Sequence, residues 1–143
     1  MPVSPAEPVT SPTPQHVLLV EDDAVLALDI AETLKEAGVA QVQHCITTDE
    51  ALIALREATP DVVILDVHLA DRDDGWAIAE LVGTLLPKPP RIIFSTGSPD
   101  DIPAAIADMG PVLEKPYDGA DLVALIREPK KVGIISRLKG VMR

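Results

Sequence analysis

The sequence predicts an α/β fold in which helices flank a parallel β-sheet. Short aliphatic runs alternate with segments of helical periodicity along the chain. The chain holds one Phe, one Tyr and one Trp, so its core must be built from Val, Ile, Leu and Ala, as a sheet buried on both faces requires. A length of 143 residues suffices for one domain with a core and is too short for two ordinary domains.

Five aliphatic runs are expected to form the strands of this sheet. Each run is short and is followed by turn or helix signals, which is typical of buried strands in a parallel sheet. The runs lie at residues 17–20, 39–45, 62–66, 91–95 and 112–114.

Amphipathic helices are expected in four of the intervals around these runs, at residues 23–37, 48–58, 75–86 and 118–127. The first helix places Leu26, Ile30 and Leu34 on one face and stops at Gly38. The second begins with a capping box at residues 47–50. The repeated alternation of strand and helix predicts right-handed crossovers and therefore a parallel sheet.

The interval at residues 98–110 differs from the others because Pro99 and Pro103 interrupt it. Proline breaks the interior of a helix, which leaves room only for a helix over residues 104–109. We therefore predict a fourth helix that is short or irregular.

The chain is expected to have three parts: a disordered leader at residues 1–15, one domain at 16–127 and a basic tail at 128–143. The leader contains five prolines among Ser, Thr and Glu, a composition that does not pack. The net charge of the whole chain is −11. The tail carries +4, so residues 1–127 together carry −15. Apolar residues near helical spacing in the tail predict a loosely attached segment, or one that docks on the domain, a partner or a membrane surface.

Composition also argues against several classes of protein. An acidic domain lacks the basic surface that nucleic-acid binding needs. No apolar run approaches the roughly 20 residues of a membrane span, and the N-terminus has no signal-peptide pattern. Cys45 is the single cysteine and so cannot form an intramolecular disulfide, which fits a reducing compartment. We expect a cytoplasmic protein.

Charged and hydroxyl side chains follow the predicted strands at the edge where parallel sheets bind ligands. Glu21 and Asp22 follow the first strand, and Asp66 ends the third. Thr96 follows the fourth, and Lys115 follows the fifth. Two carboxylates about 4 Å apart repel by roughly 4 kcal/mol at an effective dielectric near 20. The cluster therefore needs a cation or a shared proton, and an oxygen site with room for water suits Mg²⁺.

These groups form a complete set for phosphoryl capture. A carboxylate can attack phosphorus as a nucleophile and give an aspartyl phosphate. The three equatorial oxygens of the transferred group must then be neutralised. Mg²⁺ can take one oxygen, the Lys115 ammonium another, and the Thr96 hydroxyl with a backbone N–H the third.

The motifs LLVEDD, VVILDVHL, IIFSTG and VLEKPY, in this order over residues 16–127, resemble the receiver domain of two-component response regulators. The resemblance implies a flavodoxin-like, doubly wound sheet with strand order 2-1-3-4-5. It also implies that a sensor histidine kinase or a histidine phosphotransfer protein donates the phosphoryl group in a Mg²⁺-dependent reaction. The domain would then act on an unknown protein target as a diffusible adaptor, or would serve as a phosphate sink.

The resemblance also assigns roles to residues of this chain. Asp66 is the phosphoacceptor. Glu21 and Asp22 hold Mg²⁺ together with Asp66 and the backbone carbonyl of His68. Thr96 is the switch hydroxyl. Asp23 has a different expected role, because a carboxylate at that position caps the helix that follows.

The resemblance makes Lys115 the phosphate-binding lysine, with a cis peptide bond to Pro116. One departure concerns the switch aromatic residue of the family, whose place is taken by Val112. Residues 94–98, Phe-Ser-Thr-Gly-Ser, are similar to a subgroup of single-domain receivers with a Phe-Ala-Thr-Gly motif, which implies a dynamic, remodelled fourth helix.

Two other functions stay open at this point. An aspartate-nucleophile phosphatase of the haloacid dehalogenase kind would share the nucleophile, Mg²⁺ and lysine, but it has an Asp where this chain has His68. A pseudo-receiver would bind partners without phosphorylation. A receiver is a signalling domain, so we expect no enzyme.

Overall fold

The computed structural model describes residues 13–69 and 76–128, so residues 1–12 of the predicted leader and 129–143 of the predicted basic tail lie outside the described range. Five parallel strands form one sheet in the order β2-β1-β3-β4-β5. The strands are β1 (His16–Val20), β2 (Gln41–Cys45), β3 (Val62–Leu65), β4 (Arg91–Thr96) and β5 (Val112–Glu114). This is the strand order of the doubly wound, flavodoxin-like fold, which confirms the predicted architecture.

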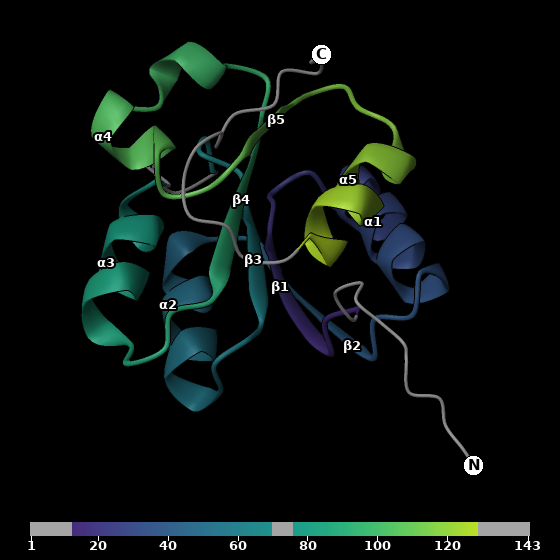
Figure 1. The fold of residues 1–143 in the computed structure, drawn as a ribbon, viewed down its shortest axis with the longest axis horizontal. Helices are drawn as coiled ribbons and strands as arrows, with labels where there is room; N and C mark the ends of the chain where they lie inside the picture. The colour runs from purple at the N-terminus through teal and green to yellow at the C-terminus, as the bar shows by residue number, and fades with distance from the viewer. Residues whose placement is uncertain (1–12, 70–75, 129–143) are drawn as a thin grey trace.

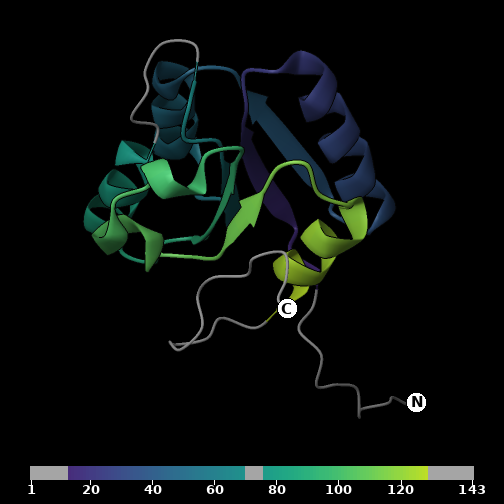
Figure 2. The same ribbon diagram turned by 90° about the horizontal axis from the view of Figure 1, so that it is seen from above.

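Helices cover both faces of the sheet (Figure 1). One face carries α1 and α5, and the other carries α2, α3 and α4 (Figures 1 and 2). The helices are α1 (Ala24–Glu36), α2 (Thr48–Glu57), α3 (Ala77–Leu85), α4 (Ala104–Ala107) and α5 (Gly119–Arg127), with a 3₁₀ helix η1 (Pro99–Asp101) before α4. None of the helices in the described ranges is long and apolar enough to cross a membrane.

Two apolar cores fill the space between the sheet and these helices. Alternate residues of β1 enter different cores, Val17 and Leu19 toward α1 and α5, and Leu18 and Val20 toward α2 and α3. All four side chains are at most 1% exposed. Successive side chains of a strand therefore point to opposite faces of the sheet. The same alternation sets the face toward which a residue directly after the strand points.

The predicted caps of α1 and α2 are confirmed. Asp23 caps α1, because its side chain accepts hydrogen bonds from the amides of Val25 (3.0 Å) and Leu26 (3.1 Å). At α2, Thr47 Oγ1 accepts from the amide of Glu50, and Glu50 Oε1 accepts from the amide of Ile46.

The second strand begins two residues later than the predicted 39–45. Gly38 has φ +108°, and the amide of Val39 donates to the carbonyl of Leu34 in α1 at 3.1 Å. Val39 therefore belongs to the C-terminal cap of the helix and packs in the core there. Its apolar side chain made it look like part of the strand.

The fourth helix is short, as predicted, with a single turn at Ala104–Ala107. It ends two residues earlier than the predicted 104–109, because the chain turns at Asp108 toward Gly110 and β5. The 3₁₀ helix η1 occupies the segment between the two prolines. The third helix is described from Ala77, and Trp76 packs against the core beside it.

Candidate functional site

The sheet itself positions the candidate residues at its carboxyl edge. The amide of Glu21 donates to the carbonyl of Cys45 at 3.0 Å, and the amide of Asp66 donates to the carbonyl of Val20 at 3.0 Å. The amide of Lys115 donates to the carbonyl of Thr96 at 2.8 Å. Each of these residues therefore extends the hydrogen-bond ladder of the strand that precedes it. The ladder fixes the backbone from which each functional side chain projects.

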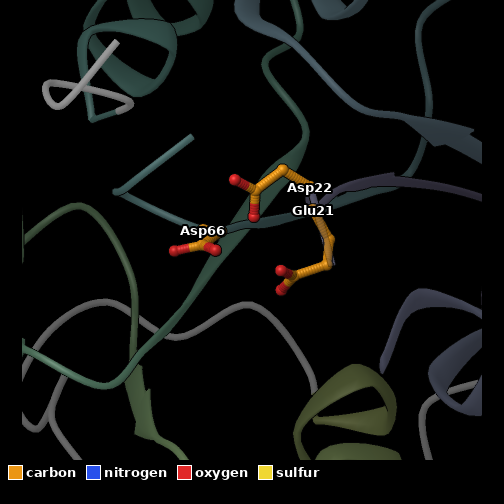
Figure 3. A group of neighbouring side chains, drawn as sticks. All are labelled: Glu21, Asp22 and Asp66. Carbon is orange, nitrogen blue, oxygen red and sulfur yellow. The ribbon is translucent and has the colours of Figure 1, made fainter. Parts of the chain in front are cut away.

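Three carboxylates converge at this edge (Figure 3). Glu21, Asp22 and Asp66 each offer an oxygen, and these oxygens lie within 4.8 Å of one another. Glu21 and Asp66 are buried, at 1% and 5% exposed, whereas Asp22 is exposed. The cluster therefore has one side open to solvent.

Lys115 partly balances the cluster. Its Nζ lies 2.9 Å from Glu21 Oε1 and 3.2 Å from Asp66 Oδ2. Burial alone would lower the pKa of Lys115, but its hydrogen bond to Glu21 and the charges of Asp66 and Glu21 raise that pKa above its ordinary value. The lysine is thus held as a fixed cation between the two buried carboxylates.

Glu21 shows what one ammonium group leaves unbalanced. Burial, with the charge of Asp66, raises the pKa of Glu21 from 4.5 to about 7, although hydrogen bonds from Lys115 and from the Asp23 amide oppose this. Near pH 7 the carboxyl group of Glu21 is therefore partly protonated. A divalent cation can replace that proton.

The three carboxylates fit the requirements of Mg²⁺. They supply oxygen ligands only, and the exposed side at Asp22 leaves space for the water molecules that Mg²⁺ retains. The predicted residues Glu21, Asp22 and Asp66 are therefore brought together in one acidic cluster with the chemistry of a cation site.

The loop after β3 binds the carboxylate oxygen of Asp66 that does not face Lys115. Its Oδ1 accepts from the amide of His68 at 3.0 Å, while Oδ2 faces Lys115. The His68 ring donates from Nε2 to Asp101 Oδ2 in η1 at 2.8 Å. The segment after β3 is thus connected to the segment after β4.

Thr96 lies at the end of β4 and is fully buried. Its hydroxyl accepts a hydrogen bond from the amide of Ser98 at 2.9 Å. The oxygen of this hydroxyl therefore binds the turn that follows β4. Val112, at the place of the family's aromatic residue, is a buried core residue.

Sequence reasoning gave no role to Ser95 and Tyr117. The Ser95 Oγ and the Tyr117 hydroxyl lie 2.9 Å apart, and Ser95 is 1% exposed. The signal that points to Ser95 is the alternation of β4, because Ser95 lies on the same face of the sheet as Glu21 and Asp66. The partner on Tyr117 depends on how the chain turns after Pro116, which no local pattern reveals.

A flavodoxin-like sheet with an acidic cluster and a lysine at its carboxyl edge defines a receiver-type signalling domain. The chain belongs to the response regulator receiver domain family, whose model matches residues 17–127. This membership confirms the resemblance found in the sequence and does not favour the phosphatase or the pseudo-receiver.

Two relatives of the chain are longer than the chain itself. The chain is 30% identical over 124 residues to the transcriptional regulatory protein PdtaR of Mycobacterium tuberculosis, covering 85% of this chain and 60% of PdtaR. It is 32% identical over 119 residues to the sensory transduction protein LytT of Bacillus cereus, covering 80% of this chain and 47% of LytT. The chain therefore spans about half of the length of these relatives.

A solved structure matches most of the domain. The CheY-like receiver domain from Methylobacillus flagellatus superposes with a TM-score of 0.68 at 28% identity. The match covers 76% of this chain and 92% of that one, so the likeness extends over nearly the whole of a receiver domain.

Proposed function

We propose that this receiver domain accepts a phosphoryl group on Asp66 and passes the signal on through protein–protein contacts. The observation that carries the proposal is the position of the Lys115 ammonium, 3.2 Å from Asp66 Oδ2 and beside two further carboxylates. Nucleophile, cation site and fixed positive charge meet at one carboxylate. This combination is suited to phosphoryl transfer.

The chemical step is a displacement at phosphorus. An Asp66 carboxylate oxygen forms a bond to the phosphorus of a phosphohistidine, and the P–N bond breaks so that the imidazole leaves with the electron pair. Lys115 neutralises charge on a phosphoryl oxygen, and the amide of His68, already directed at Asp66, orients the carboxylate. The Thr96 hydroxyl, whose oxygen accepts from the Ser98 amide, donates its own hydrogen to a further phosphoryl oxygen.

Mg²⁺ supplies the remaining charge neutralisation when it is bound. Glu21, Asp22 and Asp66 would hold the ion with the His68 carbonyl. This ligand set is all oxygen, as Mg²⁺ prefers.

The surface beside the cluster suits a phosphodonor protein. Val25 and Leu28, near the start of α1, are 79% and 62% exposed, although they are large apolar side chains. Exposed apolar side chains next to a functional group are typical of interaction sites. We assign this surface to the sensor histidine kinase or histidine phosphotransfer protein, and a cytoplasmic location follows from such a partner.

The output of the domain is assigned to the region after β4. Residues 94–98 resemble the Phe-Ala-Thr-Gly motif, η1 and a single-turn α4 follow, and no aromatic residue stands at Val112. We assign signalling to a rearrangement of this region, with a protein rather than a nucleic acid as the target. The acidic composition supports this choice.

The test is phosphorylation by a small donor. The protein is incubated with Mg²⁺ and phosphoramidate, and its intact mass is followed over time. We expect the mass of one phosphoryl group to be gained, absent in Asp66→Asn and present in Asp61→Asn, whose carboxylate lies at the opposite end of β3. No gain with phosphoramidate or with a phosphorylated histidine kinase would refute the proposal.

The cation site is tested separately by following Trp76 fluorescence during Mg²⁺ addition. We expect Asp22→Ala to weaken Mg²⁺ binding at least about tenfold, because one of few ligands is lost. A parental titration curve in Asp22→Ala would remove Asp22 from the cation site. The decay of the phosphorylated mass after donor removal distinguishes an adaptor, which retains the group, from a phosphate sink, which loses it quickly.

A further inference from the structure

Ser95 occupies the same row of the sheet as the two buried carboxylates. The register pairs Val20 with Leu65 and Leu65 with Phe94, so the next residues, Glu21, Asp66 and Ser95, continue one row across β1, β3 and β4. The residues two positions earlier, Leu19, Ile64 and Ile93, all enter the core beneath α1 and α5. By alternation, Glu21, Asp66 and Ser95 face that same side.

Lys115 reaches this row from a strand of only three residues. The amide of Lys115 donates a backbone hydrogen bond to the carbonyl of Thr96 at 2.8 Å. The next residue, Pro116, has no N–H to offer. A side-chain contact in the segment between Lys115 and the start of α5 at Gly119 would therefore add to what fixes the backbone there.

Tyr117 supplies such a contact. Its ring packs against the core beneath α1 and α5, and its hydroxyl meets Ser95 Oγ at 2.9 Å. Burial raises the pKa of Tyr117, while the hydrogen bond to Ser95 and the charge of Lys115 act to lower it. The phenol group is thus half-buried and close to the charged site.

We infer that the Ser95–Tyr117 hydroxyl pair is a positioning contact for Lys115. The pair fixes the chain after Lys115, and the Thr96 carbonyl fixes the backbone amide of Lys115 itself. Together these contacts keep the ammonium group between Glu21 and Asp66. The inference rests on the proposed function and adds two residues that act on the phosphoryl group only through the lysine.

The test uses Tyr117→Phe, which removes only the hydroxyl group, in the full chain. With phosphoramidate and Mg²⁺ as the probe, we expect the rate of phosphorylation to fall by roughly 5- to 20-fold, as for displaced positioning groups. In the Lys115→Gln background, Tyr117→Phe should cause no further loss. An equal loss in both backgrounds, or a parental rate for Tyr117→Phe, would overturn the inference.

A stability measurement separates positioning from folding. Ser95→Ala and Tyr117→Phe each leave one hydroxyl without its partner, whereas the double variant leaves neither. We expect the double variant to recover stability and to remain slow in phosphorylation. Recovery of both properties would assign the pair to folding alone. Thr84→Val, which loses a hydroxyl bond to the Glu80 carbonyl in α3, is the control and should keep the parental rate.

Crystal structures of the parent and of Tyr117→Phe decide the matter even if phosphorylation fails. We expect the distance from Lys115 Nζ to Asp66 Oδ2 to lengthen beyond about 4 Å, the limit of an ion pair. An unchanged distance would overturn the positioning contact. Failure of the parent to be phosphorylated would instead overturn the proposed function.

Discussion

An aspartate stands at each end of β3, and the two carboxylates have opposite surroundings. Asp61, before the strand, accepts hydrogen bonds on Oδ2 from the amides of Gln15 (2.9 Å) and His16 (3.0 Å). Asp66, after the strand, faces two other carboxylates and one lysine. The same residue type is satisfied by fixed backbone groups at one end and left in need of a cation at the other.

The two cationic residues at the sheet edges repeat the contrast. Arg91, at the start of β4, donates to carbonyls at the end of α5, those of Leu125, Ile126 and Glu128. Lys115, after β5, is shared between two acids. The amino edge of the sheet is thus closed by bonds to the backbone, and the carboxyl edge is kept available for a ligand.

The largest expected effect tests how tightly the two edges are packed. A Cβ at Gly110, which precedes β5, would lie 2.0 Å from the Ile92 carbonyl oxygen, whereas one at Gly97, after β4, would meet nothing within 4 Å. We expect Gly110→Ala to lower the free energy of unfolding by about 3 kcal/mol or more. Gly97→Ala should stay within about 0.5 kcal/mol of the parent. Urea denaturation measures both, and equal effects would contradict the contrast.

The next effect is the dependence of stability on pH. Because the pKa of Glu21 is raised from 4.5 to about 7, the folded state binds this proton more tightly than the unfolded state does. This contribution to stability is present below pH 4.5 and is lost as pH rises through about 7. Without Mg²⁺, we expect the free energy of unfolding to fall by at most about 1.4 kcal/mol per pH unit across that range.

Glu21→Gln supplies the matched comparison for this pH dependence. The variant should lack the slope and should be more stable than the parent at pH 8, because an uncharged amide carries no cost of burying a charge. Urea denaturation of both proteins at pH 5 and pH 8 measures the difference. A parental slope in Glu21→Gln would show that another group titrates.

The smallest effect compares the two aspartates of β3 directly. Asp61→Ala should destabilise the protein by about 1 kcal/mol, since two amides lose their acceptor. Asp66→Asn should stabilise the protein without Mg²⁺ by a similar amount, because it relieves repulsion among the carboxylates. The two measurements share one denaturation assay. Changes of the same sign would mean that Asp66 is satisfied as fully as Asp61.

The sequence predicted the elements of the fold and the residues at the carboxyl edge well, because local patterns carry both. Strand runs, the cap at Asp23 and the prolines around α4 act within a few residues of each position. The start of β2 was wrong because Val39 is apolar in either setting. Its place in the cap of α1 depends on a bond to Leu34 and not on its own character.

The contacts that adjust the site were beyond the sequence because they join distant segments. Ser95 with Tyr117, and His68 with Asp101, are set by where two loops meet after the sheet has formed. Asp61 gave no signal either, since an acid before a strand is ordinary until its amide partners are seen. For the charged residues, the residue type indicated where the site lies. Their long-range hydrogen-bond partners, which only the structure shows, distinguish the reactive groups from the structural ones.

The single tryptophan and the single tyrosine lie against different cores. Trp76 packs with the core beneath α2 and α3, and Tyr117 with the core beneath α1 and α5. The unlabelled protein therefore carries one optical reporter for each face of its sheet. Rapid mixing with a phosphodonor, read at the separate wavelengths of phenol and indole, can show whether the two layers respond in one concerted step or one after the other.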